Sequence, residues 1–311
     1  MSSPAQVFVR SAMEIRRLGT KMVAMRPIPR VVLDRRSVLM TGLAASCGVA
    51  LSIGGPLTDA ASATTNPKRY RYGTASSLQF GDLWLPSGNP TALVVLFHGG
   101  SFKAKYHASG LNPVASKLAS TGYAVWNVEY RSVGSGGGFP NTLLDAAAAL
   151  DAVHRAGYDG NVVLVGHSAG GLLAAWSASR TSKTPGGARK QAIKGLVTLS
   201  GGLNLTELAS YPGLSEQMIA LMGGTPKQVP ARYAVADPTL LLPPACPVYA
   251  VQAAQDTVVP PDEARSYVTK VKSAGGKGIF TSVPGTHASL IDPKASSWPT
   301  IAALIKRAAA S

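Results

Sequence analysis

The chain has 311 residues, of which 46% are hydrophobic and 14% charged, and its formal net charge is +15. Its 33 glycines and 22 prolines stay below the share of roughly 25–30% that is typical of low-complexity chains, so most of the chain should pack into a core. The two cysteines, Cys47 and Cys246, have the spacing of neither a zinc site nor a disulfide framework. We therefore expect no metal site and no cofactor.

The first 63 residues differ in composition from the rest of the chain. Eight basic residues lie within the first 36 positions, an uncharged and moderately apolar stretch follows at 37–56, and "ASA" stands at 61–63. This order is typical of an export signal that is cleaved after Ala63, and the pair in "DRRSVLM" resembles a twin-arginine signal. We therefore expect an exported protein, secreted or held in the cell envelope. The alternative is a retained anchor, although about 20 glycine-rich residues are marginal for a membrane span.

After such a cleavage, residues 64–311 carry 22 basic and 12 acidic side chains, a net charge of +10. The basic residues are scattered singly or in pairs, without a basic stripe interleaved with aromatic residues. We therefore expect no nucleic-acid partner and interpret the charge as a solvated surface. We also expect no stable membrane span in this part, and the sequence indicates no particular oligomeric state.

From about residue 70, apolar runs alternate with helix-like segments. The runs are continuously apolar, which predicts strands covered on both faces, at 92–97, 123–128, 161–165, 195–199, 247–253 and 278–283. Helices are predicted over 112–121, 140–156, 170–180, 261–274 and 298–309. The earlier pieces "RYRYG" and "LQFGDLWLP" are candidates for antiparallel edge strands. The alternation predicts one doubly wound α/β domain over residues 64–311.

A serine in the sequence G-H-S-A-G, Ser168, directly follows the predicted strand that ends at Val165. Ligands of such sheets bind beyond the carboxyl ends of the strands. A sharp turn from strand to helix would strain Ser168 and leave no room for side chains at Gly166 and Gly170, while the next N–H, that of Ala169, could donate to an oxyanion. We interpret Ser168 as a candidate nucleophile. A small residue at a tight turn is the alternative.

A second glycine-rich turn, His98-Gly99-Gly100-Ser101-Phe102, follows the predicted strand that ends at Phe97. Glycines let backbone N–H groups approach a negatively charged oxygen closely. We therefore expect an oxyanion hole built from the backbone amides of Gly99, Gly100, Ser101 and Ala169. The residues expected to border a compact substrate pocket are Phe102, Tyr106 and His167.

A serine nucleophile needs a base and an acid that orients the base. His287 follows the last predicted strand, and Asp256 follows the strand before it. Together with Ser168 they give the chain order Ser, Asp, His that occurs in α/β-hydrolases. The alternatives are His107 for the base and Asp262 or Asp292 for the acid.

From about residue 90 to 300 the chain resembles the α/β-hydrolases of the esterase and lipase superfamily, close to the group that pairs an H-G-G-x-[WF] loop with G-H-S-A-G-G. "VEYRSVGSGGGFPNTLLDAAAAL" is similar to that group's Y-R, variable loop, F-P and D-x-x-A-A, and "HASLIDP" resembles its histidine loop. The resemblance implies an α/β-hydrolase fold, with Ser168 as nucleophile, His287 as general base and acid, and Asp256 holding the imidazole. Ser101 stands where the H-G-G-G esterases have their third glycine.

Residues 202–245, between two predicted strands, are too long for a simple crossover, so we expect them to form a small cap over the pocket. The candidates for its apolar lining are Tyr211, Leu214, Met218 and Leu221. The alternative is a segment that packs only on its own core.

The sequence thus predicts an exported serine hydrolase, a carboxylesterase that cleaves short-chain or aryl esters through an acyl-enzyme intermediate. Because the same pair of motifs occurs in kynurenine formamidase-like enzymes, arylformamidase or peptidase activity on a small-molecule amide is an alternative. An envelope-associated binding protein with weakened catalysis is an alternative of a different class, because a fold does not fix a function.

Overall fold

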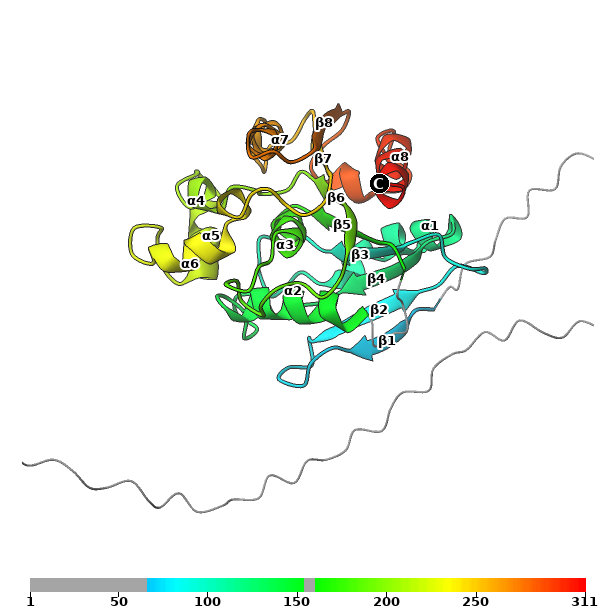
Figure 1. The fold of residues 1–311 in the computed structure, drawn as a ribbon, viewed down its shortest axis with the longest axis horizontal. Helices are drawn as coiled ribbons and strands as arrows, with labels where there is room; N and C mark the ends of the chain where they lie inside the picture. Colours follow the sequence, from blue (N-terminus) through cyan, green and yellow to red (C-terminus); the bar gives the residue numbers. More distant parts are fainter. Residues whose placement is uncertain (1–65, 154–159) are drawn as a thin grey trace, which may run out of the picture. The chain divides into compact units, whose positions relative to one another are not determined.

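The computed structural model describes residues 66–153 and 160–311. The predicted signal at 1–63 and the last three residues of the helix predicted over 140–156 lie outside the described residues. Eight strands form one sheet in the order β1-β2-β4-β3-β5-β6-β7-β8 (Figure 1). The strands are β1 (Lys68–Arg71), β2 (Phe80–Trp84), β3 (Leu93–Phe97), β4 (Ala124–Val128), β5 (Val162–His167), β6 (Ile193–Leu199), β7 (Val248–Ala253) and β8 (Gly278–Val283).

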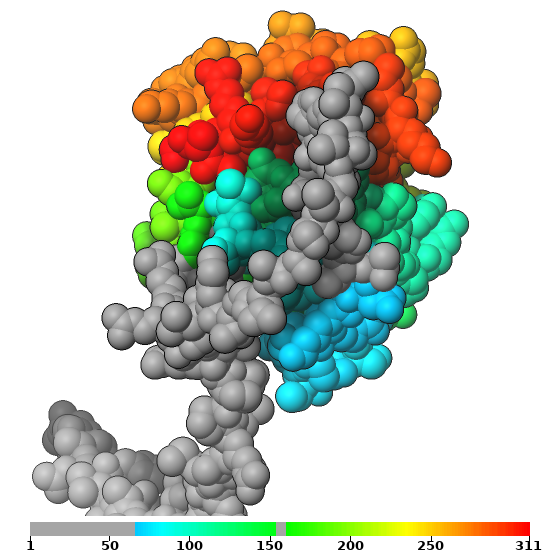
Figure 2. All heavy atoms as spheres, turned by 90° about the vertical axis from the view of Figure 1, so that its right-hand side faces the viewer, coloured from blue at the N-terminus to red at the C-terminus, as the bar shows by residue number. Residues whose placement is uncertain are grey.

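The sheet is parallel except at one edge. β1 pairs antiparallel with β2, and β2 pairs antiparallel with β4, while all pairs from β4 to β8 are parallel. The predicted α/β-hydrolase fold with its mostly parallel sheet is therefore confirmed. Both candidate edge pieces form antiparallel strands, but only β1 lies at the edge, because β2 pairs with β4 on its other side. In Figure 2 the β1 edge (blue) lies at the bottom of the coloured face and the C-terminal helix (red) in its upper half.

Helices cover both faces of the sheet. One face packs against α1 (Asn112–Ser120) and α8 (Trp298–Ala309). The other face packs against α2 (Asn141–Asp151), α3 (Ala169–Ala178) and α7 (Glu263–Ser273) (Figure 1). Short 3-10 turns lie at η1 (Ala108–Leu111), η3 (Pro238–Leu240) and η4 (Ala288–Ile291).

The double cover explains why the strands are continuously apolar. All five residues of β3 are buried: Leu93, Val95 and Phe97 face the core under α3, whereas Val94 and Leu96 face the core under α1 and α8. Burying each such side chain contributes on the order of 1.5–3 kcal/mol. A strand with one polar face would lose that contribution on one side of the sheet.

The central helix α3 is buried along its whole length, from Ala169 to Ala178. Its small residues allow close packing: a Cβ at Gly171 would lie 2.6 Å from the Cα of Gly201. At its other end, the indole N–H of Trp176 donates to the carbonyl oxygen of Val235, at 2.9 Å. Because α3 begins directly after Ser168, this rigid packing fixes where the serine stands.

The segment between β6 and β7 forms three short helices: α4 (Leu205–Leu208), α5 (Ser215–Met222) and α6 (Pro230–Ala236). We call residues 202–245 the insertion. Its start is held by Glu263 of α7, whose Oε1 accepts hydrogen bonds from the N–H groups of Leu203 and Asn204, both at 2.6 Å. In Figure 1 its helices α4, α5 and α6 lie to the left of α3.

The Y-R … D-x-x-A-A pattern of the sequence corresponds to a buried ion pair. The guanidinium of Arg131, just after β4, donates through Nε to Oδ2 of Asp145 at 2.8 Å and through Nη2 to Oδ1 at 2.7 Å. Asp145 on α2 is fully buried, and its Oδ1 also accepts from Gln79 at 2.6 Å. The pair clamps the chain that leaves β4 against α2, so this part of the motif is structural.

Candidate active site

The turn at Ser168 joins β5 to α3 in a strained conformation. Ser168 has φ 53° and ψ −122°, a region that costs a residue with a side chain about 1–3 kcal/mol. Hydrogen bonds hold it there: its N–H donates to the carbonyl oxygen of Leu199 at 3.0 Å, and its carbonyl accepts from the N–H of Gly171 at 2.8 Å. The strained turn expected from the sequence is therefore present, and it lifts the serine out of the strand.

The two glycines of the motif are required because backbone meets backbone around this turn. A Cβ on Gly166 would collide with the carbonyl oxygen of Gly170, and a Cβ on Gly170 would collide with that of Phe97 at the end of β3. The glycine-rich turn after β3 is equally close, since a Cβ on Gly99 would lie 3.0 Å from the Cβ of Ser168. The two turns that were predicted separately therefore pack directly on each other.

His287 and Asp256 form a hydrogen-bonded pair at the ends of β8 and β7. Nδ1 of His287 lies 2.8 Å from Oδ2 of Asp256, and the carboxylate is 1% exposed. Burial alone would raise the pKa of Asp256, but hydrogen bonds from His287, from Ser200 and from the N–H groups of Val259 and Val258 outweigh it and lower the pKa to about 2. Because a carboxylate only accepts, the ring nitrogen that faces it, Nδ1, is the donor of this hydrogen bond, which leaves Nε2 as the nitrogen that can act as a base.

The imidazole of His287 lies beside the serine turn. Its ring centroid is 4.6 Å from that of His167, the residue that precedes Ser168. Burial, and then the nearby His287, lower the pKa of His167 to about 4, so this ring is neutral and its Nε2–H donates to the carbonyl oxygen of His287 at 2.9 Å. Within the described residues no hydrogen bond joins the Ser168 hydroxyl to the imidazole, a bond that in many enzymes tightens only when substrate binds.

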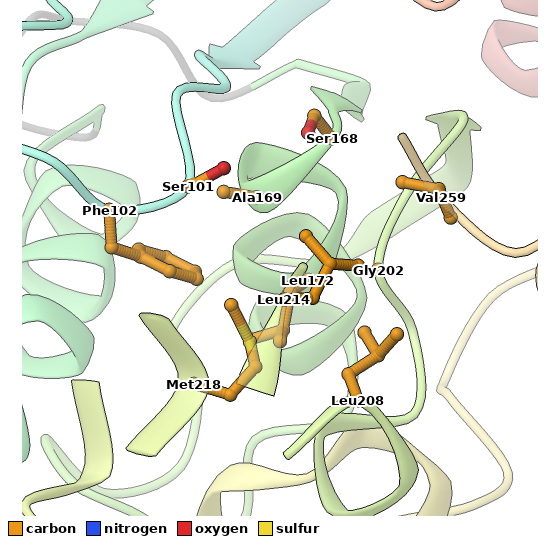
Figure 3. A pocket seen from close by; sticks show the side chains of 10 residues that line it. All are labelled: Ser101, Phe102, Ser168, Ala169, Leu172, Gly202, Leu208, Leu214, Met218 and Val259. Atoms are coloured by element: carbon orange, nitrogen blue, oxygen red, sulfur yellow. The ribbon is translucent and has the colours of Figure 1, made fainter. Parts of the chain in front are cut away.

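The turn after β3, which packs on the serine turn, contains backbone N–H groups without a backbone acceptor. The N–H of Lys103 donates to the carbonyl oxygen of Gly100 at 3.0 Å, and both central residues have positive φ, 52° at Ser101 and 57° at Phe102. In the described part of the chain, the N–H groups of Ser101 and of Ala169 have no backbone acceptor. The two N–H groups come from segments far apart in the chain, and the residues that carry them line the same cavity as Ser168 (Figure 3).

Glu129, a buried carboxylate that the sequence did not indicate, contacts the first residue of this turn, His98. Its Oε1 lies 3.2 Å from Nε2 of His98 and accepts from the N–H of Tyr130 at 3.1 Å, and its Oε2 accepts from the N–H of Ala108 at 2.9 Å. The hydroxyl of Tyr130 donates to the carbonyl oxygen of His98 at 2.7 Å, and the two rings stack. His98 is the first residue of the glycine-rich turn, so Glu129 holds the turn at its root.

His107, the alternative base, belongs to the Glu129 cluster. Its Nδ1 lies 3.3 Å from Oε2 of Glu129, and its side chain is 48% exposed. The alternative acids, Asp262 and Asp292, are exposed. The structure thus brings Ser168, His287 and Asp256 to one end of the sheet and sets the alternatives apart from the imidazole–carboxylate pair.

A small apolar cavity opens beside Ser168. Its volume is about 20 Å³. It is lined by Ser101, Phe102, Ser168, Ala169, Leu172, Gly202, Leu208, Leu214, Met218 and Val259 (Figure 3). Four of them belong to the insertion: Gly202 is its first residue, and Leu208, Leu214 and Met218 come from α4, from the turn before α5, and from α5. The insertion therefore closes one side of the cavity.

Several residues expected to border the pocket lie elsewhere. Tyr106 is 46% exposed and His167 is turned toward the His287 carbonyl, so of the three only Phe102 is among the lining residues. Of the insertion residues, Leu221 is buried in the core and Tyr211 is 37% exposed, and neither is among the lining residues. The side-chain directions within the insertion were not readable from its sequence.

The chain matches the family model BD-FAE over residues 82–271, more than half of its length. It belongs to the BD-FAE family. This is an α/β-hydrolase esterase family, in agreement with the resemblance drawn from the two glycine motifs. A comparison with curated proteins gives no match.

Solved structures share the fold of this BD-FAE member. A truncated form of a carbohydrate esterase from gut microbiota is 20% identical, with a TM-score of 0.67 over 83% of this chain and 100% of that one. Esterase B from Lactobacillus Rhamnosis (HN001) is 16% identical, with a TM-score of 0.68 over 79% and 86%. Thermogutta terrifontis esterase 2, phosphonylated by sarin, is 17% identical, with a TM-score of 0.63 over 78% and 93%. At these identities the likeness establishes a shared fold.

Two further properties concern the described part of this BD-FAE chain. Among residues 66–153 and 160–311, no three metal-ligating side chains gather into a cluster. In the same ranges, no helix combines the length and the apolar character needed to cross a membrane.

The Glu129 cluster predicts a pH-dependent contribution to stability. Burial would raise the pKa of Glu129, but the hydrogen bond and charge of His98 and the N–H groups of Ala108 and Tyr130 outweigh it and lower the pKa below 4.5. A lowered pKa means that the carboxylate stabilises the fold above about pH 4.5, and that this contribution is lost as the pH falls through the folded-state pKa. Glu129→Gln should therefore lower the melting temperature at about pH 7 by on the order of 5–10 °C. The reason is that the amide NH₂ group, a hydrogen-bond donor, would face N–H groups that are donors as well.

The difference in melting temperature between the wild type and Glu129→Gln should become smaller as the pH is lowered to about 4. Thermal unfolding followed by circular dichroism measures both melting temperatures. Glu216→Gln is the control, since Glu216 is exposed and its replacement should change little at either pH. A difference in melting temperature that stays constant or grows on acidification would contradict a stabilising role of the ionised Glu129 carboxylate.

Proposed function

We propose that this BD-FAE member is a serine hydrolase that cleaves carboxylic esters of short acyl groups through an acyl-enzyme intermediate. The observation that carries the proposal is the meeting, at Ser168, of a strained serine, an imidazole held by a buried carboxylate, and a small apolar cavity. The family and the esterase titles of the structural neighbours support the same reaction.

The geometry supports a two-step mechanism. The Ser168 hydroxyl attacks the ester carbonyl while Nε2 of His287 takes its proton, and Asp256 stabilises the imidazolium that forms. The oxyanion is held by the N–H of Ala169 and by those of the turn at Gly99–Ser101. The intermediate then collapses: the C–O bond to the alcohol breaks, the alcohol leaves with the proton from His287, and the acyl group stays on Ser168.

Water completes the reaction by the same route. A water molecule gives a proton to His287 and attacks the acyl-enzyme, which passes through a second oxyanion and releases the carboxylic acid. The proton returns to the Ser168 oxygen. The sum is one ester and one water converted to one acid and one alcohol, with the protein unchanged.

The cavity supports the restriction to short acyl groups. The cavity is small, and its walls, such as Leu172 and Met218, are apolar and buried. An acyl chain of one or two carbons fits there, while the alcohol side remains outside. A formyl group is smaller still, so hydrolysis of an aryl formamide is the second candidate function favoured by this cavity.

We further propose that the chain is exported, on the basis of the basic segment, the apolar stretch and "ASA" at 61–63. Protein recovered from outside the cytoplasm should begin at Thr64, as read by N-terminal sequencing or intact mass. Replacement of both arginines of the pair at 35–36 by lysine should retain the chain in the cytoplasm. An external protein that still carries residues 1–63 would favour the anchor.

A fluorophosphonate probe tests the nucleophile and the base together. The wild type should be labelled at Ser168, as the Thermogutta terrifontis neighbour is phosphonylated by sarin, and Ser168→Ala should not be labelled. His287→Ala should label at least about 10²-fold more slowly, because the hydroxyl loses its base. The matched control is His107→Ala, which removes an imidazole of the Glu129 cluster and should label at close to the wild-type rate.

The labelling outcomes separate the alternatives. A folded wild type that is not labelled would favour the binding-protein alternative. A loss of labelling in His107→Ala with retention in His287→Ala would make His107 the base. Mass spectrometry of the labelled peptide locates the modified serine.

A substrate panel tests the cavity. Turnover of p-nitrophenyl acetate should exceed that of the hexanoate by about 10²-fold or more, since each methylene without room loses binding of about 1 kcal/mol or more. An aryl formamide in the same panel distinguishes the two candidate functions. Equal turnover of acetate and hexanoate would show that the insertion does not close the cavity during catalysis.

A further inference from the structure

Ser101 occupies a backbone position that glycine would occupy without strain. Its φ of 52°, at the first central position of the turn closed by Lys103, lies in the left-handed region that favours glycine. The next residue, Phe102, is equally strained, but its ring is 1% exposed and lines the cavity, so burial offsets the cost. A serine side chain is too small for burial to account for its presence in the same way.

The Ser101 hydroxyl is free and faces the site. Ser101 is among the residues that line the cavity, and in Figure 3 the hydroxyls of Ser101 and Ser168 are both directed toward the space beside Ala169. Within the described residues, Oγ of Ser101 has no hydrogen-bond partner in the protein. A hydroxyl without a protein partner, carried by a strained residue and lining the same cavity as Ser168, is the combination expected of a group kept for a ligand.

We propose that the Ser101 hydroxyl donates a hydrogen bond to the oxyanion, in addition to the backbone N–H groups of Ser101 and Ala169. The turn is placed for this role, because Gly99 packs against the Cβ of Ser168 and Glu129 fixes His98 at the root of the turn. The hydroxyl keeps its proton throughout: it rotates toward the carbonyl oxygen as negative charge develops, and no bond to it breaks. This inference rests on the proposed ester hydrolysis.

Two substitutions at Ser101 distinguish the effect of its hydroxyl from the effect of its strained backbone. Ser101→Gly removes the hydroxyl and relieves the strain, while Ser101→Ala removes the hydroxyl and keeps the strain. For p-nitrophenyl acetate, both should lower kcat by about 10²-fold with KM nearly unchanged, because the donor acts on the transition state. Ser101→Gly should also melt at a higher temperature than the wild type, and Ser101→Ala should not.

A trifluoromethyl ketone, which forms a tetrahedral oxyanion on a nucleophilic serine, supplies the second readout. Its inhibition constant should rise in both variants by about the same factor as kcat falls. A variant pair with wild-type kcat and inhibition constant would overturn the role of the hydroxyl. So would a loss confined to KM, which would indicate that Ser101 acts only on ground-state binding.

The wild type distinguishes this failure from failure of the proposed function. If the wild-type chain hydrolyses the ester and is labelled at Ser168 while Ser101→Gly keeps full kcat, only the role of Ser101 is wrong. If the folded wild type neither hydrolyses the ester nor reacts with the fluorophosphonate, the proposed function fails, and the assignment of the Ser101 hydroxyl fails with it.

Discussion

The site depends on a contact between three backbone segments, which pack so closely that no side chain fits between them. The end of β3, the turn after β5 and the first residues of α3 approach so closely that a Cβ on Gly166 or Gly170 would overlap a carbonyl oxygen. Gly99 continues this contact to Ser168 itself. Because these segments touch through backbone, Ser168 and the glycine-rich turn beside it are held with the rigidity of the sheet rather than that of a loop.

Strain is concentrated where this contact is made. In the described part of the chain, four residues other than glycine have positive φ: Ser101, Phe102, Ser168 and Ser200. Three of them line the cavity, and the fourth accepts a hydrogen bond from Ala253 through its hydroxyl and helps lower the pKa of Asp256. Strain persists in a fold only where surrounding contacts impose it, and here those contacts are the ones that assemble the site.

Two buried carboxylates serve this arrangement in different ways. Asp256 orients an imidazole at the open end of β7, while Glu129 fixes the root of the glycine-rich turn on the far side of Ser168. For both, hydrogen bonds outweigh burial and keep the carboxyl ionised, as their lowered pKa values show. Neither carboxylate lines the cavity beside Ser168, whose walls include apolar side chains of the insertion.

The sequence by itself determined the strands, most helix positions, the strained turn and the order of Ser168, Asp256 and His287, because burial on both faces and tight turns leave local patterns. Glu129, the partner of His98, and Ser200, which contacts Asp256, left no such pattern, because each is defined by segments distant in the chain. Within the insertion, Leu214 lines the cavity and Leu221 packs into the core, although both are leucines in one helical stretch. Only the tertiary structure decides which of these side chains faces the cavity, since this depends on how the insertion packs against α3.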